Sequence, residues 1–243
     1  MDNSTDRIIL IDKPLRWTSF DVVKKLKKPL LEEYRMQFPE AERKTIKRFK
    51  VGHAGTLDPL ATGLLVLCTG KLTKKISEIQ DAEKEYTGTI VLGATTASYD
   101  LETVPEEHKP FDFVTEQMVL DMAKSMEGIQ QQIPPIHSAI KVDGRRAYDM
   151  ARKGQEVELK SRTIEIRQFE ITRIELPEID FRIVCTKGTY IRSLAHDFGQ
   201  KIGTGGHLSA LCRTRIGTYD LKNDVNPLDF LSQITVNKPI TEP

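Results

Sequence analysis

The chain has 243 residues, enough to bury a full apolar core in one large mixed domain or in two small ones. Its 36 Lys and Arg residues nearly balance its 35 Asp and Glu residues, so the net charge of +1 gives no indication of an anionic partner. The three cysteines are too few and too far apart for a disulfide framework or a zinc knuckle, and no apolar run approaches the ~20 residues of a membrane span, so we expect a soluble, cytoplasmic protein.

Charge is unevenly distributed along the chain. Residues 24–50 contain ten basic and four acidic residues (net +6), and residues 182–215 contain six basic and one acidic residue (net +5). Residues 78–127 contain three basic and twelve acidic residues, a net charge of −9. This segregation predicts a basic face suited to a polyanion, although charged residues that merely coat helices would give the same counts.

Strand and helix signals alternate irregularly in the first half of the chain. Strand signals occur at residues 7–12, 64–68 and 85–92. A helix is predicted over residues 19–28, with Ser19 as its N-cap and Pro29 near its end. Residues 29–50 are charged and weakly patterned, which indicates an irregular basic excursion.

The second half contains two amphipathic helix signals. One helix is capped by Thr115 and closed by Gly128, and the other covers residues 189–202. The apolar face of the first consists of Met118, Val119, Met122, Ala123 and Met126. The apolar face of the second consists of Ile191, Leu194, Ala195 and Phe198. We expect both faces, methionines included, to pack in the core.

Two further strands, at 164–175 and 179–186, are predicted to pair across a turn at Pro177. The tail, residues 223–243, is weakly patterned and is expected to be partly disordered. Because strands and helices mix without strict alternation, the sequence predicts an α+β fold with a largely antiparallel central sheet flanked by helices.

The most distinctive stretch is GHAGTLDPLATG at residues 52–63, which places Asp58 in a turn ahead of an apolar run. Gly55 allows the backbone to approach a docked molecule, while Pro59 disfavours helical geometry at Asp58. Because residues 63–70 indicate a buried strand, the carboxylate would be anchored on the core and presented to a substrate. An aspartate that merely satisfies its own turn is the other interpretation of a single Asp-Pro pair.

Together with three further motifs, this stretch resembles the TruB family of tRNA pseudouridine synthases. The other motifs, in the same order, are DKPLRWTS at 12–19, EKEYTG at 83–88 and KGTYIRSLAHDFG at 187–199. The resemblance implies a pseudouridine synthase-like catalytic domain that flips the T-loop uridine of tRNA, uridine-55, and isomerises it to pseudouridine. Such a reaction needs no cofactor and no metal.

The resemblance makes Asp58, Arg192 and Tyr86 the catalytic residues. A carboxylate is needed beside the ribose C1′ and C2′, as nucleophile or base, while the glycosidic bond breaks. A guanidinium is the partner that stays charged in a closed pocket, although a lone arginine at a helix edge can also extend to solvent. The Tyr86 ring can stack on uracil, or it can be an ordinary cross-strand aromatic.

Four residues are implied to bind the substrate. By resemblance, His53 fills the space left by the flipped base, and Tyr190 and Leu211 line the pocket. No second histidine lies at metal-ligand spacing from His53, which argues against a metal site. Lys13 is expected either to support the pocket or to be a surface lysine at a strand end.

Residues 132–154 resemble the RNA-binding insertion of the family, at about 130–160. We expect a helix after Gly144 that presents a basic stripe to RNA phosphates, unless that stripe is a solvated surface. The stripe consists of Arg145, Arg146, Arg152 and Lys153.

The expected organisation is a catalytic domain over residues 1–222 and a short tail over 223–243, with the family's further C-terminal RNA-binding domain absent. The expected partner is the T-arm stem-loop of tRNA, bound by a monomer with no guide RNA and no membrane. Two alternatives are a guide-dependent or ribosomal-RNA synthase and a catalytically silent tRNA-folding module. The absent domain argues against guide dependence, and the presence of Asp58, Tyr86 and Arg192 together argues against silence.

Overall fold

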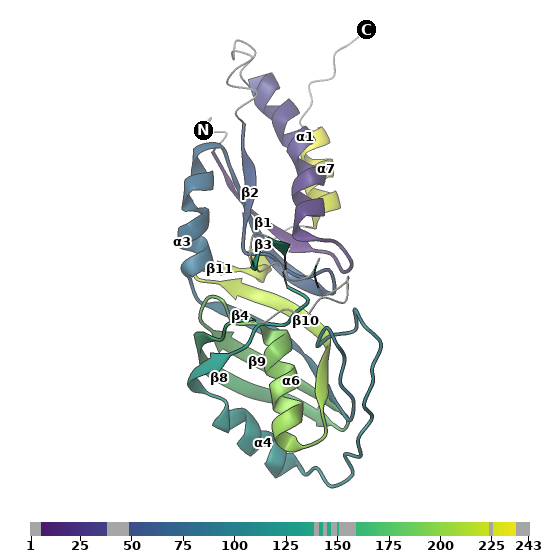
Figure 1. Ribbon diagram of the computed structural model, residues 1–243. Coiled ribbons are helices and arrows are strands. Elements are labelled where there is room, and N and C mark those ends of the chain that lie inside the picture. Colours follow the sequence, from purple (N-terminus) through teal and green to yellow (C-terminus); the bar gives the residue numbers. More distant parts are fainter. Residues whose placement is uncertain are drawn as a thin grey trace. The chain divides into compact units, whose positions relative to one another are not determined.

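The computed structural model describes residues 6–37, 49–138, 141–142, 145–146, 150, 159–223 and 226–236. The chain forms two compact units. Unit 1 consists of Met1–Ala82 and Cys212–Pro243, and unit 2 consists of Glu83–Leu211. Each unit contains antiparallel strands with helices packed against them, which confirms the predicted α+β class (Figure 1).

Unit 1 is organised around strand β3 (Ala61–Thr69), which is buried along most of its length. Strand β1 (Ile8–Lys13) pairs antiparallel with β3, with Ile8 opposite Cys68 and Lys13 opposite Gly63. Strand β2 (Val51–Ala54) also pairs antiparallel with β3. Strand β10 (Gly206–Ile216) ends in this unit, where β11 (Tyr219–Asp220) pairs with it.

The strands of unit 1 have an apolar cluster on each face. On one face, Ile9, Ile11, Leu65 and Leu67 pack with apolar residues of helix α1 (Ser19–Gln37). On the other face, alternate residues such as Leu64 and Val66 pack with helix α3 (Ile76–Asp81), which follows the short helix η1 (Gly70–Lys75). Because both faces of β3 are covered, nearly every residue along the strand is apolar.

Helix α1 is longer than the sequence predicted. Its first residue is Ser19, but the N-cap is Thr18, whose Oγ1 accepts a hydrogen bond from Asp21 N at 3.0 Å, so the predicted cap is one residue too late. The helix continues through Pro29 to Gln37, so the predicted end at Pro29 is also wrong. Proline in a helix interior removes a backbone hydrogen bond and costs about 3 kcal/mol. Buried Leu30, directly after the proline, extends the apolar face of Val22, Val23 and Leu26, and this packing offsets the cost.

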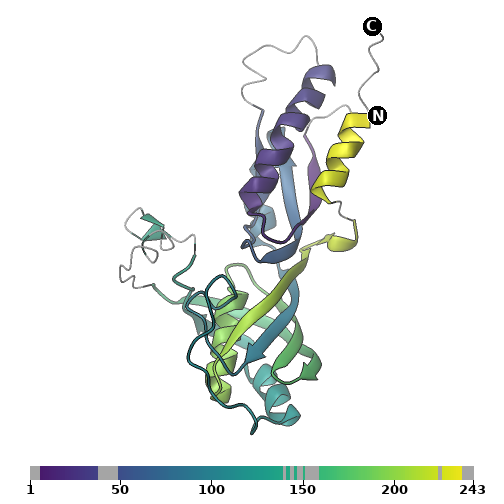
Figure 2. The same ribbon diagram turned by 90° about the vertical axis from the view of Figure 1, so that its right-hand side faces the viewer.

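The tail, expected to be weakly patterned and partly disordered, contains a helix that the sequence did not predict, α7 (Pro227–Val236). Asn226 caps it: its side-chain Oδ1 accepts a hydrogen bond from Leu228 N at 2.9 Å. Proline is favoured at a first helical position because its fixed φ already suits the helix. Phe230 and Leu231 pack on the same cluster as α1, and two views show α1 and α7 side by side (Figures 1 and 2).

Unit 2 contains a four-stranded antiparallel arrangement in the order β4-β9-β8-β5. Its strands are β4 (Lys84–Leu92), β5 (Gly128–Gln132), β8 (Arg162–Glu175) and β9 (Glu178–Cys185). The predicted pairing of the last two across Pro177 is confirmed, with Glu175 opposite Glu178.

Two predicted helices of unit 2 are confirmed, although the first ends at Ser125 and Gly128, predicted to close it, is the first residue of β5. Helix α4 (Glu116–Ser125) is capped by the Thr115 side chain, which accepts from Met118 N, and helix α6 (Ile191–Ile202) ends at Gly203. Helix α4 packs against β8 and α6, and Phe198 of α6 lies 5.6 Å from the ring of Phe169 in β8. Met126 is buried, but Met118 is exposed, so the expected apolar face of α4 is only partly in the core.

The region after Gly144 does not begin with the expected helix. Arg145 and Arg146 form strand β7 (Arg145–Arg146), which pairs with β6 (Lys141–Val142) in a small separate sheet. The two strands are separated in the sequence by Asp-Gly, a pair strongly favoured in two-residue hairpins. Arg152 and Lys153 lie outside the described residues, so the predicted stripe keeps only its sequence basis there.

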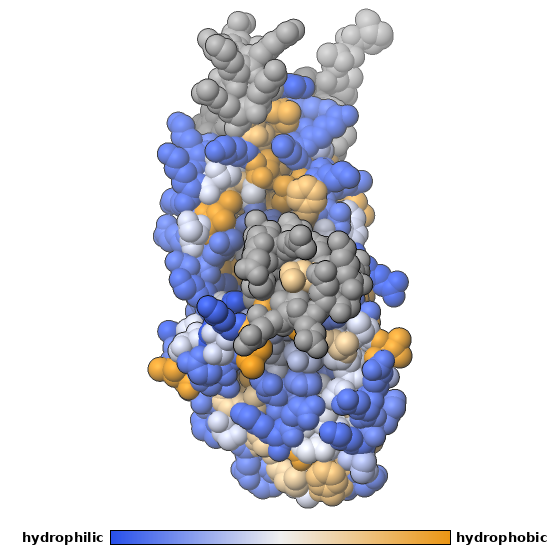
Figure 3. Space-filling view, viewed as in Figure 1, coloured by the Kyte–Doolittle hydropathy of each residue, from blue (hydrophilic) through white to orange (hydrophobic). Residues whose placement is uncertain are grey.

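Hydrophilic side chains cover most of the described surface in the view of Figure 3, and apolar ones occur in small separate groups. Among the described residues, no helix is long and apolar enough to cross a membrane.

Candidate active site

Asp58 lies in the loop between β2 and β3 of unit 1, and this loop is tied down on both sides of the aspartate. Before it, the Ser19 hydroxyl bonds both backbone polar groups of Leu57, accepting from N at 2.8 Å and donating to O at 3.2 Å. After it, Pro59 O accepts from Arg16 N at 2.7 Å. The start of α1 therefore fixes the loop that carries the carboxylate.

Lys13 lies at the end of β1 and is fully buried, so it is not a surface lysine. Its Nζ donates to the backbone oxygens of Trp17 at 2.6 Å, Pro14 at 3.0 Å and Pro59 at 3.5 Å. Burial lowers the pKa of Lys13 to about 8, while the charge of Asp58 opposes this shift. Lys13 thus holds the loop and places a cation within electrostatic reach of the carboxylate.

A second buried cation, Arg213 of β10, is 1% exposed. Its Nε donates to Leu64 O at 2.9 Å and its Nη2 donates to Gly55 O at 3.0 Å, so one guanidinium bonds to backbone on both sides of Asp58. Gly55 has φ of +92°, and a Cβ there would lie 3.3 Å from Nη1. Both the dihedral angle and the contact favour glycine at this position.

His53 lies on β2, opposite Leu67, and is half-buried. Burial, and secondarily the charge of Arg213, lower the pKa of His53 below its ordinary value. The imidazole is therefore neutral at pH 7. A neutral ring can pack against RNA bases without the cost of desolvating a charge.

In unit 2, Arg192 is the second residue of α6 and is 3% exposed, which excludes a side chain extended into solvent. Its Nη1 donates to Ser98 O at 3.0 Å and its Nη2 donates to His137 O at 2.9 Å. Its Nε lies 3.7 Å from Oδ2 of buried Asp100. Arg192 is thus held rigidly by groups from two loops.

Tyr86 and Tyr190 also lie in unit 2. Tyr86 is buried on β4, opposite Ile183 of β9. Tyr190 is the N-cap residue of α6, and its backbone exchanges two hydrogen bonds with the Gln132 side chain, at 2.8 and 3.0 Å. The Arg162 guanidinium lies 5.2 Å from the centre of the Tyr190 ring.

The predicted site residues therefore fall into two groups. Unit 1 brings Asp58, Lys13 and His53 together around Arg213. Unit 2 contains Arg192, Tyr86, Tyr190 and Leu211, the last on β10. Within the described residues, no group of three or more His, Cys, Asp or Glu side chains could hold a metal ion.

Sequence reasoning missed Arg213 and Asp100. Asp100 lies in the acidic stretch 78–127, where one aspartate among twelve acidic residues carries no distinguishing signal. Arg213 occurs in CRTR, directly after the predicted pocket residue Leu211. The position of Arg213 in a partly apolar strand is the one sequence feature that could have indicated a buried, functional arginine.

The fold and the carboxylate loop define the class, which is that of the pseudouridylate synthases. A model described as "TruB family pseudouridylate synthase (N terminal domain)" matches residues 43–191, and "tRNA pseudouridylate synthase B C-terminal domain" matches residues 192–238. The chain is 54% identical over 220 residues to a tRNA pseudouridine synthase B of Flavobacterium johnsoniae, covering 90% of this chain and 92% of that protein. A relative of the same name from Phocaeicola vulgatus is 44% identical over the full length of both. The chain belongs to the TruB family.

Solved structures share the fold. A chain in the crystal structure of a Cbf5-Nop10-Gar1 complex matches 95% of this chain with a TM-score of 0.67 and 29% identity. A chain in the structure of an H/ACA RNP bound to a substrate RNA containing 2′-deoxyuridine matches with a TM-score of 0.65 and 27% identity. This chain spans 54% of each of those longer chains.

The pKa of Lys13 predicts the alkaline limit of activity. Above pH 8 the amine loses a proton, and with it one donor to the loop carbonyls and a positive charge near Asp58. We expect the single-turnover rate at saturating RNA to fall with an apparent pKa of about 8. The rate should be measured from pH 6 to 9.5 on the wild type and on Lys13→Met, which should lack this transition whatever its absolute rate.

The free energy of unfolding is the control for this pH dependence, because Lys13 should change it in the opposite direction to the rate. The folded-state pKa of Lys13 lies below the unfolded value of 10.5, so the unfolded chain binds more protons between pH 8 and 10.5. The contribution of Lys13 to the free energy of unfolding therefore rises over this range. A rate that stays flat to pH 9.5, or that falls equally in Lys13→Met, would contradict the role assigned to the amine.

Proposed function

We propose that this protein is a tRNA pseudouridine synthase that isomerises uridine-55 in the T-arm stem-loop, acting as a monomer without a guide RNA. The observation that carries the proposal is the Asp58 loop, whose backbone on both sides of the aspartate is held by Ser19 of α1, Lys13 and Arg213. Binding alone would not require an acid held beside two buried cations. Membership of the TruB family and the names of the relatives from Flavobacterium and Phocaeicola support the same activity.

The reaction exchanges one bond of the uridine for another. The bond from ribose C1′ to uracil N1 breaks, the base turns, and C1′ bonds to C5. The proton at C5 leaves and N1 gains one, so no electrons are gained or lost. Asp58 is the acid that acts at the ribose while the glycosidic bond breaks, because an ionised carboxylate is required there.

The surrounding cations favour that ionised state. Lys13 lies within electrostatic reach of Asp58, and a positive charge there attracts an ionised carboxylate. In this proposal, Arg192 of unit 2 adds a permanent positive charge to the reaction, held in place by Ser98, His137 and Asp100.

The base must leave its stack before C1′ can be reached, which costs a few kcal/mol. Stacking of uracil on Tyr86 returns about 1 to 3 kcal/mol. His53, neutral at pH 7, fills the space left in the RNA, and Tyr190 and Leu211 line the pocket. The basic residues of the 130–160 insertion contact the RNA backbone: Arg145, Arg146, Arg152 and Lys153.

The purified protein is expected to convert uridine-55 of an unmodified tRNA transcript with no guide RNA. Pseudouridine is mapped by carbodiimide-dependent primer extension. A prefolded T-arm stem-loop should react in the presence of a chelator, because the proposed chemistry uses only side chains of the chain.

The matched control is the same stem-loop with cytidine at the target position, which should give no stop in primer extension. Pseudouridine that forms only when a guide RNA is added would favour a guide-dependent synthase. Binding of tRNA without any conversion would favour the silent folding module.

A further inference from the structure

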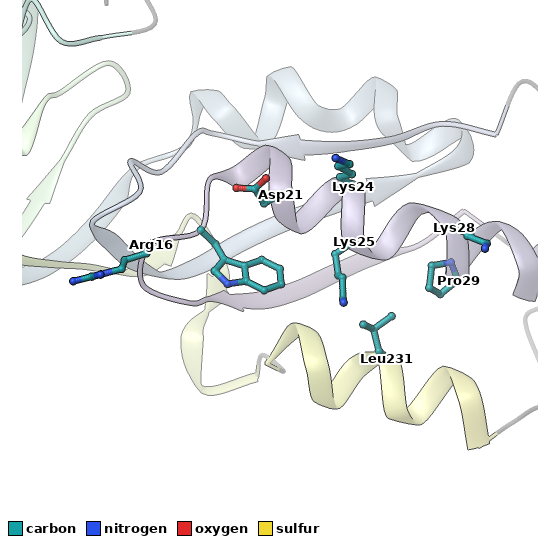
Figure 4. Close-up of a pocket in the computed structure, with 8 residues that line it drawn as sticks. Arg16, Asp21, Lys24, Lys25, Lys28, Pro29 and Leu231 are labelled. Carbon is teal, nitrogen blue, oxygen red and sulfur yellow. The ribbon is translucent and has the colours of Figure 1, made fainter. Parts of the chain in front are cut away.

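A groove in unit 1 lies outside the residues assigned above. It has a volume of about 730 Å³ and runs beside α1 toward α7. Its lining includes four cationic and two large apolar side chains, Arg16, Lys24, Lys25, Lys28, Trp17 and Leu231. Figure 4 shows Arg16 at one end, Lys28 at the other, and Lys25 between them, directed toward Leu231 of α7.

The groove is strongly positive. It has one carboxylate, Asp21, whose Oδ2 accepts hydrogen bonds from Thr18 N at 2.9 Å and Thr18 Oγ1 at 2.6 Å. These bonds to Thr18 lower the pKa of Asp21, which keeps it as a charged cap of α1. Four cations and one anion leave a net charge of +3.

Little of this positive charge is neutralised inside the protein. Among the described residues, one of the four groove cations forms an ion pair: Lys28 lies 4.0 Å from Glu32. The Lys28 side chain is 85% exposed, and exposed pairs of this kind contribute little free energy. The groove therefore suits an anionic occupant.

One end of the groove adjoins the Asp58 loop. Arg16 donates its backbone N–H to Pro59, next to Asp58, and Ser19 at the first turn of α1 bonds to Leu57. At 1.5 Å per helical residue, Lys24 and Lys28 lie about 7.5 and 13.5 Å along the axis from Ser19. A strand whose nucleotide reacts at Asp58 thus has its neighbouring phosphates within reach of these lysines.

Aromatic side chains accompany the cations. Trp17 lines the groove, and Phe20, in the first turn of α1, is 68% exposed. Trp17 is half-buried and packs against the apolar cluster under α1. Aromatic side chains interleaved with Lys and Arg are typical of surfaces that bind single-stranded nucleic acid, where rings stack on bases and cations contact phosphates.

We propose that this groove binds the sugar-phosphate backbone of the substrate RNA beside the uridine that reacts, with Arg16, Lys24, Lys25 and Lys28 contacting phosphates and Trp17 contacting a ribose or base. The inference rests on the proposed function, since it takes the same RNA as occupant. It assigns part of the affinity for RNA to unit 1.

The test compares two triple variants of equal charge change. Lys24→Gln, Lys25→Gln and Lys28→Gln remove the groove lysines. Lys71→Gln, Lys74→Gln and Lys75→Gln remove exposed lysines of η1, which leads into α3 on the opposite face of the unit 1 strands. Affinity for a T-arm stem-loop is measured by filter binding at several salt concentrations, and melting curves confirm folding.

The groove variant should bind on the order of tenfold more weakly near physiological salt, with a salt slope flatter by about 2 to 3 units. The η1 variant should bind like the wild type, and a triple Lys→Arg variant of the groove should retain affinity. Trp17 is the one tryptophan of the chain, so its emission should change saturably as RNA binds.

Equal losses in the two glutamine variants would overturn the inference, because only general charge would then matter. Unchanged Trp17 emission at RNA concentrations that saturate filter binding would also overturn it. Failure of the proposed function is separate: the wild type would then bind RNA without producing pseudouridine, and the affinity comparison would still report on the groove.

Discussion

Asp58→Asn is expected to lower the single-turnover rate of pseudouridine formation by about 1,000-fold or more, while the Kd for tRNA changes by less than about threefold. Asparagine keeps the size of the side chain but cannot act as nucleophile or base. The loop should stay in place, because its bonds to Ser19, Arg16, Lys13 and Arg213 use backbone atoms of other residues. Rapid-quench kinetics and filter binding measure the two effects separately.

The matched control is Asp112→Asn, the same chemical change at an exposed position of unit 2. It should leave the rate and the Kd at wild-type values. Substantial turnover by Asp58→Asn would remove Asp58 from the centre of the reaction. Loss of RNA binding together with turnover would indicate that the carboxylate shapes the binding surface instead.

The elements that the sequence predicted well are those whose signals are local. Thr115 caps α4 through a hydrogen bond to a residue three positions on, and α6 ends at a glycine with φ of +100°. The pairing of β8 with β9 follows from two apolar runs separated by a short turn. Such features depend on neighbours in the sequence, so they can be inferred without knowing the fold.

The errors arise where packing outweighs a local preference or where a short signal was overlooked. Pro29 lies inside α1 because the helix continues to bury apolar residues such as Leu30. Asn226-Pro227 is a helix-start signal hidden in a weakly patterned tail. The Asp-Gly pair before Arg145 favours a hairpin over the helix that the basic spacing suggested.

The candidate site likewise contains features that local sequence shows and features that only tertiary structure shows. The Asp58 loop is a contiguous motif, so its identity and its family resemblance are visible in twelve consecutive residues. The residues that hold the loop come from elsewhere: Arg213 bonds to Gly55 and Leu64 across 158 and 149 positions of sequence. Arg192 likewise bonds to Ser98, 94 positions away. Contacts at such separations follow from tertiary structure and leave no pattern in one sequence.

The second large effect is expected from Arg192→Met, which should lower the free energy of unfolding by about 3 to 5 kcal/mol and abolish turnover. The substitution leaves the Asp100 carboxylate buried without the Arg192 cation, and it removes the hydrogen bonds that Arg192 donates to the oxygens of Ser98 and His137. Urea denaturation measures the stability. Arg192→Lys should recover only part of both properties, because an ammonium cannot reproduce the planar fork that reaches all three acceptors.

A double variant separates the structural role of Arg192 from its role in the reaction. Arg192→Met with Asp100→Asn removes the uncompensated charge, while asparagine can still accept the hydrogen bond that Oδ1 receives from Glu102 N at 3.0 Å. The free energy of unfolding should then recover substantially, since an unpaired buried charge causes most of the loss. Turnover should remain absent, because the permanent positive charge that Arg192 is proposed to add to the reaction is still missing. A stable double variant with wild-type turnover would restrict Arg192 to holding the Ser98 and His137 loops together.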